Sequence, residues 1–333
     1  MRHALLTAAA VLGVLAGTAR GQDALLAPAA PPSPDERIAY MCPIHSDYTS
    51  DIAGRCPRDG MALVRATPFD VRDYGMEFFT EPRVVTAGES ATLRFAIRHP
   101  ASGELVREFA MVHDRRYHLF VVSQDMEYFE HIHPEQEADG TWTIDVTLPR
   151  DGYYKVLSDF VPSGGTAQFI ARPLVTRGYD GDLVDDGARL VPDTMLTKTV
   201  GDLSATLTFD PPTFVAGLYG HLNFHLSDTA TGEPVTDLQA YLGAFGHTLI
   251  LNEELTEYVH SHPIDLSAGF DEEAGPMLFM IPMGVDAETL RGGPEVSFDG
   301  LMPRAGRYRA FTQFRRHDEI RTFVFTFEVA AAE

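Results

Sequence analysis

The sequence predicts an all-β protein built largely from antiparallel β-sandwiches. Three observations support this fold class: short alternating runs broken by Gly, Pro and Asp, an internal repeat, and the lack of a useful helical period after the N-terminal segment. Large apolar residues recur at every second position in Leu93–Arg98 and in Trp142–Leu148. Many short strands separated by turn residues are typical of antiparallel sandwiches.

The chain contains two copies of one segment. Adding 129 to the residue number maps turn, apolar and histidine residues of the first copy onto identical residues of the second: Leu93, Phe95, Gly103, Glu104, Val106, His118, His131, His133 and Pro134. Further on the offset becomes 154, which matches Tyr154 with Tyr308 and Phe160 with Phe314. The repeat therefore predicts two immunoglobulin-like sandwiches of one design, and the two tyrosines are expected to be packing residues.

Composition divides the chain into six segments. Met1 to Gly21 has a positive start, an apolar stretch and small residues before a cleavage position, which is typical of a secretory signal peptide. The other segments are a Pro/Ala-rich linker at 22–37, a small cysteine-containing module at 38–66, sandwich 1 at 67–178, an acidic linker at 179–196 and sandwich 2 at 197–332. We expect a periplasmic or secreted protein with no membrane insertion after signal removal.

The charge balance excludes some partners. The chain has 48 acidic and 26 basic residues, which gives a net charge of −22 with histidine counted neutral. Such a surface repels phosphate backbones and attracts cations, so nucleic acid is not an expected partner and metal ions are. The sequence also lacks a Walker loop, a dinucleotide-binding glycine motif, a nucleophile elbow and an H-E-x-x-H motif.

Six of the 13 histidines follow one pattern, H-x12-H-x-H-P, which occurs once in each copy. They are His118, His131 and His133 in the first copy and His247, His260 and His262 in the second. Residues two apart on a strand share a face, and a hairpin turn centred between Gln124 and Asp125 would bring the third histidine opposite the second. Three converging imidazoles suit zinc or copper. We therefore predict a separate three-histidine metal site in each sandwich.

Three points qualify this interpretation. The alternative is that the histidines are polar strand residues on a solvated face. Asp159 lies in the first copy where the second has Gln313, and its carboxylate suggests an outer partner or a fourth ligand for the first site. Met277, Met280 and Met283 are three residues apart, which does not place them on one strand face, so we expect a hydrophobic insert there and not a copper(I) site.

The segment from Tyr40 to Val64 resembles a known small domain. It is similar to the bacterial heavy-metal-binding domain Y-x-C-P-x-H…G-x-C-P-x-C-G-M-x-L of copper/silver efflux adaptors and copper P-type ATPases. The matching positions are Tyr40, Cys42, Pro43, His45, Gly54, Cys56, Pro57, Gly60, Met61 and Leu63. Ile44 replaces the usual Met, and Asp59 replaces the last Cys. The resemblance implies a small metal-binding module.

The ligands that the resemblance implies are Cys42, His45, Cys56 and Met61, to which Asp59 could be added. The alternative is a Cys42–Cys56 disulfide, since these are the only cysteines of a chain expected in an oxidising compartment. Both alternatives stay open at this point.

The predicted function is an exported, soluble transition-metal-binding protein for capture, buffering or hand-over in metal homeostasis or efflux. Copper is the expected metal, zinc is the alternative, and a metal efflux system is the expected protein partner. Two other classes remain: a metal-dependent enzyme that uses an open position on a three-histidine site, and a cell-surface adhesion or scaffold protein with incidental histidines. The sequence shows no general base beside either triplet, which disfavours the enzyme.

Overall fold

The computed structural model describes residues 39–42, 49–50, 53–56, 60–66, 74–100, 102–112, 114–182, 187–264, 270–271, 275–276 and 289–332. Several residues named above lie outside this part: the signal peptide, the Pro/Ala linker, His45, Asp59, Met277, Met280 and Met283. The described residues form strands and no α-helix, and their sheets build two repeated immunoglobulin-like sandwiches. The predicted fold class is therefore confirmed. No helix in the described part is long and apolar enough to cross a membrane.

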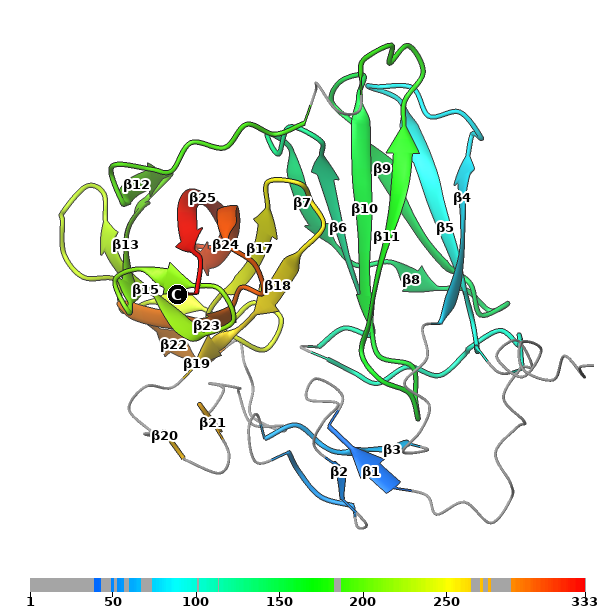
Figure 1. Cartoon of the computed structure of the whole chain (residues 1–333), viewed down its shortest axis with the longest axis horizontal. Coiled ribbons are helices and arrows are strands. Elements are labelled where there is room, and N and C mark those ends of the chain that lie inside the picture. Colours follow the sequence, from blue (N-terminus) through cyan, green and yellow to red (C-terminus); the bar gives the residue numbers. More distant parts are fainter. Residues whose placement is uncertain are drawn as a thin grey trace, which may run out of the picture. The chain divides into compact units, whose positions relative to one another are not determined.

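Sandwich 1 consists of two antiparallel sheets around an aromatic core. The first has the order β4 (Gly75–Glu81), β5 (Ser90–Arg98), β9 (Trp142–Thr147), β8 (Glu135–Gln136). The second, the β6 sheet, has the order β11 (Gln168–Val175), β10 (Tyr153–Phe160), β6 (Tyr117–Ser123), β7 (Phe129–Ile132). The cyan and green strands of Figure 1 trace them. Phe95, Tyr117 and Trp142 are buried between the two sheets, as the alternation in β5 and β9 predicts.

Sandwich 2 repeats this arrangement with additional short strands. Its first sheet has the order β12 (Thr197–Val200), β13 (Leu203–Asp210), β15 (Tyr219–Asp228), β23 (Glu295–Leu301), β19 (Pro263–Ile264). Its second, the β17 sheet, contains β14 (Phe214–Val215), β25 (Glu319–Ala330), β24 (Gly306–Arg316), β16 (Leu238–Gln239), β22 (Arg291–Gly292), β17 (His247–Asn252) and β18 (Tyr258–Ser261). All pairs are antiparallel except β14 with β25.

Two smaller sheets lie outside the sandwiches. β1 (Ala39–Met41) pairs with β2 (Thr49–Ser50) and β3 (Val64–Ala66), and β20 (Phe270–Asp271) pairs with β21 (Gly275–Pro276). Cys42, Cys56 and Leu63 form the apolar centre of the N-terminal module, with Tyr40 packed against them. The module is thus a small β-unit with its own core.

Equivalent tyrosines close the two sandwiches in the same way. Tyr154 is buried and its hydroxyl donates to the Arg150 carbonyl at 2.8 Å, and Tyr308 donates to the Arg304 carbonyl at 2.9 Å. A buried tyrosine bonded to backbone a few residues upstream is a hallmark of immunoglobulin-like sandwiches. The expectation that both are packing residues is confirmed.

The β6 sheet and the β17 sheet also pack against each other. Every residue of β6 and of β17 is buried, so both faces of these strands are covered. A third apolar cluster joins the two sandwiches and the linker between them: Phe120, Val122, Met126, Leu157, Ala188, Leu190, Leu249, Leu251, Leu255 and Phe311. A strand that is covered on both faces typically has a continuous run of apolar residues. This explains why most residues after Tyr117 in β6 are apolar.

Equivalent residues make reciprocal contacts across this interface. Lys155 donates to the Leu255 carbonyl at 2.6 Å, and Arg309 donates to the Met126 carbonyl at 3.0 Å. The repeat offsets map Lys155 onto Arg309 and Met126 onto Leu255. When residue i contacts j and the copy of j contacts the copy of i, the interface is related by a two-fold axis. The two sandwiches therefore meet with pseudo-two-fold symmetry.

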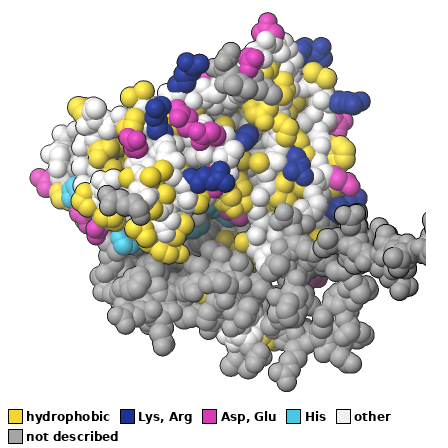
Figure 2. Space-filling view, viewed as in Figure 1, with side chains coloured by type: hydrophobic (Ala, Val, Ile, Leu, Met, Phe, Trp, Pro, Cys, Tyr) yellow, Lys and Arg dark blue, Asp and Glu magenta, His cyan; other side chains and the backbone are white. Residues whose placement is uncertain are grey.

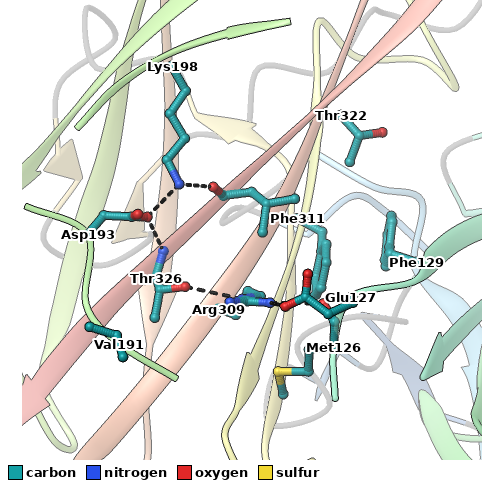
Figure 3. Close-up of a pocket in the computed structure, with 11 residues that line it drawn as sticks. Met126, Glu127, Phe129, Val191, Asp193, Lys198, Arg309, Phe311, Thr322 and Thr326 are labelled. Carbon is teal, nitrogen blue, oxygen red and sulfur yellow. Dashed lines mark hydrogen bonds and ion pairs between the residues drawn. The ribbon is translucent and has the colours of Figure 1, made fainter. Parts of the chain in front are cut away.

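A pocket opens beside one of these reciprocal contacts. Figure 3 shows Arg309 on its wall bonded to Glu127, with Lys198 and Asp193 paired further along. Lys198 also donates to the Val324 carbonyl at 2.6 Å. Since both basic side chains that line it already have partners, we treat this pocket as part of the interface.

Candidate metal centre

The six predicted histidines gather in one cluster at the interface between the sandwiches. Ring centroids of neighbours within a copy are as close as 4.8 Å (His131–His133) and 4.5 Å (His260–His262). Centroids from different copies are about 1 Å further apart, at 5.4 Å for His118–His260 and 5.9 Å for His131–His247, which still places the rings in one cluster. The prediction of two separate sites is therefore wrong. The histidine-bearing face of each sheet is the face that packs on the other sandwich, so the two triplets merge.

The hairpin register differs by two residues from the predicted one. His131 lies opposite Phe120 and His260 opposite Leu249, so the turn is centred one residue later than expected. Met126 takes up this shift with a left-handed backbone, at φ 57°. The slip moves the pairing by two positions, which leaves the histidines on one shared face. The predicted face is right although the predicted partner of His118 is wrong.

The first histidine of each copy is anchored by a backbone carbonyl. His118 Nε2 lies 3.0 Å from the Val112 oxygen, and His247 Nε2 lies 2.7 Å from the Tyr241 oxygen. A carbonyl oxygen only accepts, so Nε2 carries the proton in both rings and donates it. In a neutral ring the lone pair is then on Nδ1.

The second histidine of each copy is anchored across the interface. His260 Nδ1 donates to the Asp159 carboxylate at 2.7 Å, and His131 Nδ1 donates to the Gln313 side-chain oxygen at 3.1 Å. Gln313 is oriented by its amide, which donates to Thr322 Oγ1 at 3.1 Å. The lone pairs of His131 and His260 are then on Nε2. Asp159 is an outer partner as predicted, but of a histidine from the other copy.

Two of these lone pairs face each other. His118 Nδ1 and His131 Nε2 are 3.1 Å apart, and the outward bonds of both rings place their protons on the opposite nitrogens. Neither ring then has a proton to share along this line, so the two nitrogens repel unless a cation lies between them. Two nitrogens bound tetrahedrally to zinc at about 2.0–2.1 Å are roughly 3.3 Å apart, close to the distance found here.

Burial keeps these rings neutral. Desolvation lowers the pKa of His118 to about 4 and that of His133 to about 3, and neighbouring histidines lower both further. The pKa values of His131 and His247 lie well below the usual value for the same two reasons. Neutral imidazole is the form that binds metal, so these four rings are ready as ligands at neutral pH.

The ligand atoms fall into two overlapping sets of three. His118, His131 and His260 form one, and His247, His260 and His262 form the other, with all ligand atoms of a set within 4.8 Å of one another. His133 lies in the cluster but in neither set, so the first set differs from the predicted triplet. In the described part of the chain, the Nε2 atoms of His133 and His260 are buried without a hydrogen-bond partner.

Sequence reasoning missed the outer partners that come from outside the motif. The carbonyls of Val112 and Tyr241 carry no side-chain chemistry, and Gln313 is notable only as the counterpart of Asp159. The repeat offset of 129 that relates the histidines also maps Val112 onto Tyr241. That correspondence was available in the sequence, but nothing marked these positions as acceptors.

The N-terminal module offers candidate metal ligands of a different kind from the histidine cluster, because most of them are sulfur atoms. Cys42, Cys56 and Met61 are all buried, and the two cysteines belong to one small apolar cluster, so ligation and a disulfide both remain predictions. His45 lies outside the described residues. Metal binding by Cys42, His45, Cys56 and Met61 stays a prediction.

Surface charge is mixed on the face that Figure 2 presents. Among the described residues there, Lys and Arg side chains lie between Asp and Glu side chains and apolar patches. The acidic excess of the sequence is therefore not gathered into one acidic field on that face. Buried imidazoles, and not a carboxylate surface, form the candidate cation site.

Several bacterial proteins are among the solved structures to which the chain is similar. The adhesin FdeC of Escherichia coli is 14% identical with a TM-score of 0.24, over 82% of this chain and 68% of that chain. The bacterial integrin-binding protein invasin is 12% identical with a TM-score of 0.21, over 78% and 40%. InvD of Yersinia pseudotuberculosis is 10% identical with a TM-score of 0.23, over 77% and 58%. At these scores the likeness carries no argument about function.

A search of curated proteins found no match. A family model does match, over residues 70–173 and 198–331, which lie within the two sandwiches. These two ranges cover more than half of the chain. The chain belongs to the family described as Domain of unknown function (DUF8832).

Proposed function

We propose that this protein binds a transition-metal ion in the histidine cluster between its two sandwiches. The observation that carries the proposal is the pair of facing lone pairs on His118 Nδ1 and His131 Nε2, 3.1 Å apart in rings whose N–H groups are bonded outward. Metal-binding histidines characteristically donate their other N–H to a carbonyl or carboxylate, as these do. The cluster has this arrangement without the ion.

The chemistry of the donor set favours copper(II) or zinc(II). Within the described residues, the two sets consist of imidazole nitrogens only. Imidazole is a borderline ligand that suits both ions, whereas copper(I) prefers thiolate and thioether sulfur. We propose copper as the cargo, zinc as the alternative, and capture, buffering or hand-over in metal homeostasis or efflux as the role of an exported protein.

A second candidate is a cell-surface adhesion or scaffold protein. The names of the similar solved structures, such as an adhesin and an integrin-binding protein, describe those proteins alone. In this alternative the buried histidines only join the two sandwiches, and the structure does not change with metal. The two functions therefore differ in one measurable property, the affinity of the cluster for metal.

Calorimetric titration of the full chain with Zn²⁺ and Cu²⁺ at pH 7.5 tests the proposal. We expect saturable binding and, by X-ray absorption, a first shell of nitrogen or oxygen at about 2.0 Å with no sulfur. His225→Gln is the matched control, because His225 is exposed and paired with Glu295 outside the cluster. It should bind like the parent chain. Failure of the parent to bind either ion would leave the scaffold function.

A further inference from the structure

The two three-histidine sets have one member in common. His260 belongs both to the set with His118 and His131 and to the set with His247 and His262. No other histidine of the described chain is shared in this way. The number of ions that the cluster can hold therefore depends on how many ions His260 can bind.

His260 has one nitrogen to offer. Its Nδ1 donates to Asp159 Oδ2 at 2.7 Å, with the histidine side chain 6% and the aspartate side chain 23% exposed. The ring then has a single lone pair, on Nε2, and this buried atom has no hydrogen-bond partner among the described residues. One lone pair coordinates one ion at a time.

We infer that the two sets are alternative positions of a single ion, with His260 as the ligand common to both. This inference rests on the proposed function and deepens it. An ion in the cluster can exchange His118 and His131 for His247 and His262 while His260 stays bound, so it passes from one sandwich to the other without leaving the interface. A hand-over step of this kind needs no change in the fold.

A departure from the pseudo-two-fold symmetry distinguishes His260, the shared ligand, from its counterpart His131. His131 donates to the neutral amide oxygen of Gln313, whereas His260 donates to a carboxylate. A carboxylate partner holds the ring in one tautomer and orientation and places a negative charge beside it. Asp159 is therefore a positioning residue for the ligand on which both positions depend.

The first test is stoichiometry. Titration of the full chain with Zn²⁺, together with elemental analysis after desalting, should give one ion in the histidine cluster. Because the N-terminal module is a second candidate site, the same measurement on Cys42→Ser/Cys56→Ser isolates the cluster. Two ions in that variant would overturn the inference and leave metal binding intact. No ion would instead overturn the proposed function.

The second test uses replacements that keep the outward hydrogen bonds. His118→Gln and His247→Gln retain an N–H for the Val112 and Tyr241 carbonyls but lose the inward nitrogen. Each should still bind one Zn²⁺ with an affinity reduced by less than about ten-fold, because the other position remains. His260→Asn retains a donor for Asp159 and should lose about 100-fold or more, because both positions lose a ligand.

Combining the first two replacements sharpens the test. His118→Gln/His247→Gln should lose as much affinity as His260→Asn, although each single change is mild. Equal losses in all three single variants would mean one fixed site that uses every ring, and would contradict alternative positions. Thermal unfolding in EDTA verifies that each variant is folded before its affinity is compared.

Discussion

The two sandwiches differ little where backbone sets the geometry and more where side chains meet. His118 and His247 are anchored by equivalent carbonyls, and Lys155 and Arg309 make the same reciprocal bond. The copies diverge in the partner of the second histidine, which is supplied by Asp159 in one copy and by Gln313 in the other. A repeat can thus keep a binding geometry while a single side chain makes its halves electrostatically unequal.

A second difference shows how the interface tolerates divergence. In sandwich 1 Phe120 lies opposite Leu157 on the neighbouring strand, and in sandwich 2 Leu249 lies opposite Phe311. Each of these two residue pairs thus contains one leucine and one phenylalanine, with the order exchanged. Volume-conserving exchanges are the substitutions that packed interiors accept best. The interface keeps its total volume although its individual residues differ.

The largest expected effect is acid destabilisation of the metal-free protein. The pKa of His118 is about 4 and that of His133 about 3 in the folded state, whereas an unfolded histidine titrates near 6.5. The unfolded chain therefore binds more protons as pH falls below 6.5, and stability is lost down to the folded pKa. His118 alone costs about 1.6 kcal/mol between pH 6.5 and pH 5.

Urea unfolding of the EDTA-treated chain at several pH values measures this effect. The pKa values of His131 and His247 are also lowered, so both sandwiches contribute and the total is several-fold larger than one histidine gives. His118→Gln should make the dependence shallower by about 1.4 kcal/mol per pH unit. A free energy of unfolding that is flat from pH 7 to pH 5 would show that the rings are not buried as neutral groups.

The next effect concerns the exchanged leucine and phenylalanine. Phe311 is 2% exposed and stacks on Phe129 with centroids 4.4 Å apart, so Phe311→Ala should cost about 3–5 kcal/mol. The double change Phe120→Leu/Leu157→Phe gives sandwich 1 the order found in sandwich 2 and should cost less than about 1.5 kcal/mol. Chemical denaturation compares them. Similar losses for both would mean that the interface is specified residue by residue and not by its volume.

The sequence predicts the sandwiches well because alternation is a local property. Leu93–Arg98 and Trp142–Leu148 alternate because one face of β5 and of β9 meets the core and the other does not. The same period correctly places His131 and His133 on one face. Turn geometry was harder to predict, since the left-handed Met126 shifts the register and a methionine is not a typical residue for that conformation.

The merging of the triplets depends on contacts that no local pattern encodes. A signal for it was nevertheless present: the run from Tyr117 to Val122 is apolar at almost every position, and a sheet with one solvated face should alternate. Leu119 and Val121 face the core of sandwich 1, while Phe120 and Val122 face sandwich 2. Because the histidines are buried in this interface, they are not the exposed strand-end residues that the hairpin alone implies.

The third effect concerns the unequal outer partners. Asp159→Asn removes the charge from the partner of His260 and should weaken Zn²⁺ binding by about 10–100-fold. The reciprocal change, Gln313→Glu, gives His131 a carboxylate and should strengthen binding or leave it unchanged. In the double variant the carboxylate lies beside His131 and no longer beside His260. Its Zn²⁺ affinity should recover in part relative to Asp159→Asn. The cobalt(II) absorption spectrum provides a readout that a loss of folding alone does not reproduce.

Matched affinities for Asp159→Asn and the parent chain would argue that outer partners only hold the rings in place. In that case the two halves of the cluster are equivalent, and His260 has no advantage over His131. Asp159→Glu is the conservative control, because it keeps the negative charge, although the longer side chain shifts the position of the carboxylate. Partial recovery relative to Asp159→Asn is expected.

The smallest effect tests the reciprocal bonds beside the cluster. Lys155 and Arg309 each donate to a hairpin carbonyl of the other sandwich, and Arg309 also pairs with Glu127 at 3.0 Å. Replacing either by Met keeps the aliphatic stem and removes a charged hydrogen bond, which costs about 1.5–3 kcal/mol when buried and less when partly exposed. Burial lowers the pKa of Lys155, so part of its bond energy is already offset by desolvation. Lys155→Met should therefore cost less than Arg309→Met, by urea unfolding at pH 7.5 in EDTA. The opposite order would mean that the bond of Lys155 to Leu255 does more to hold the sandwiches together than the bonds of Arg309 to Met126 and Glu127.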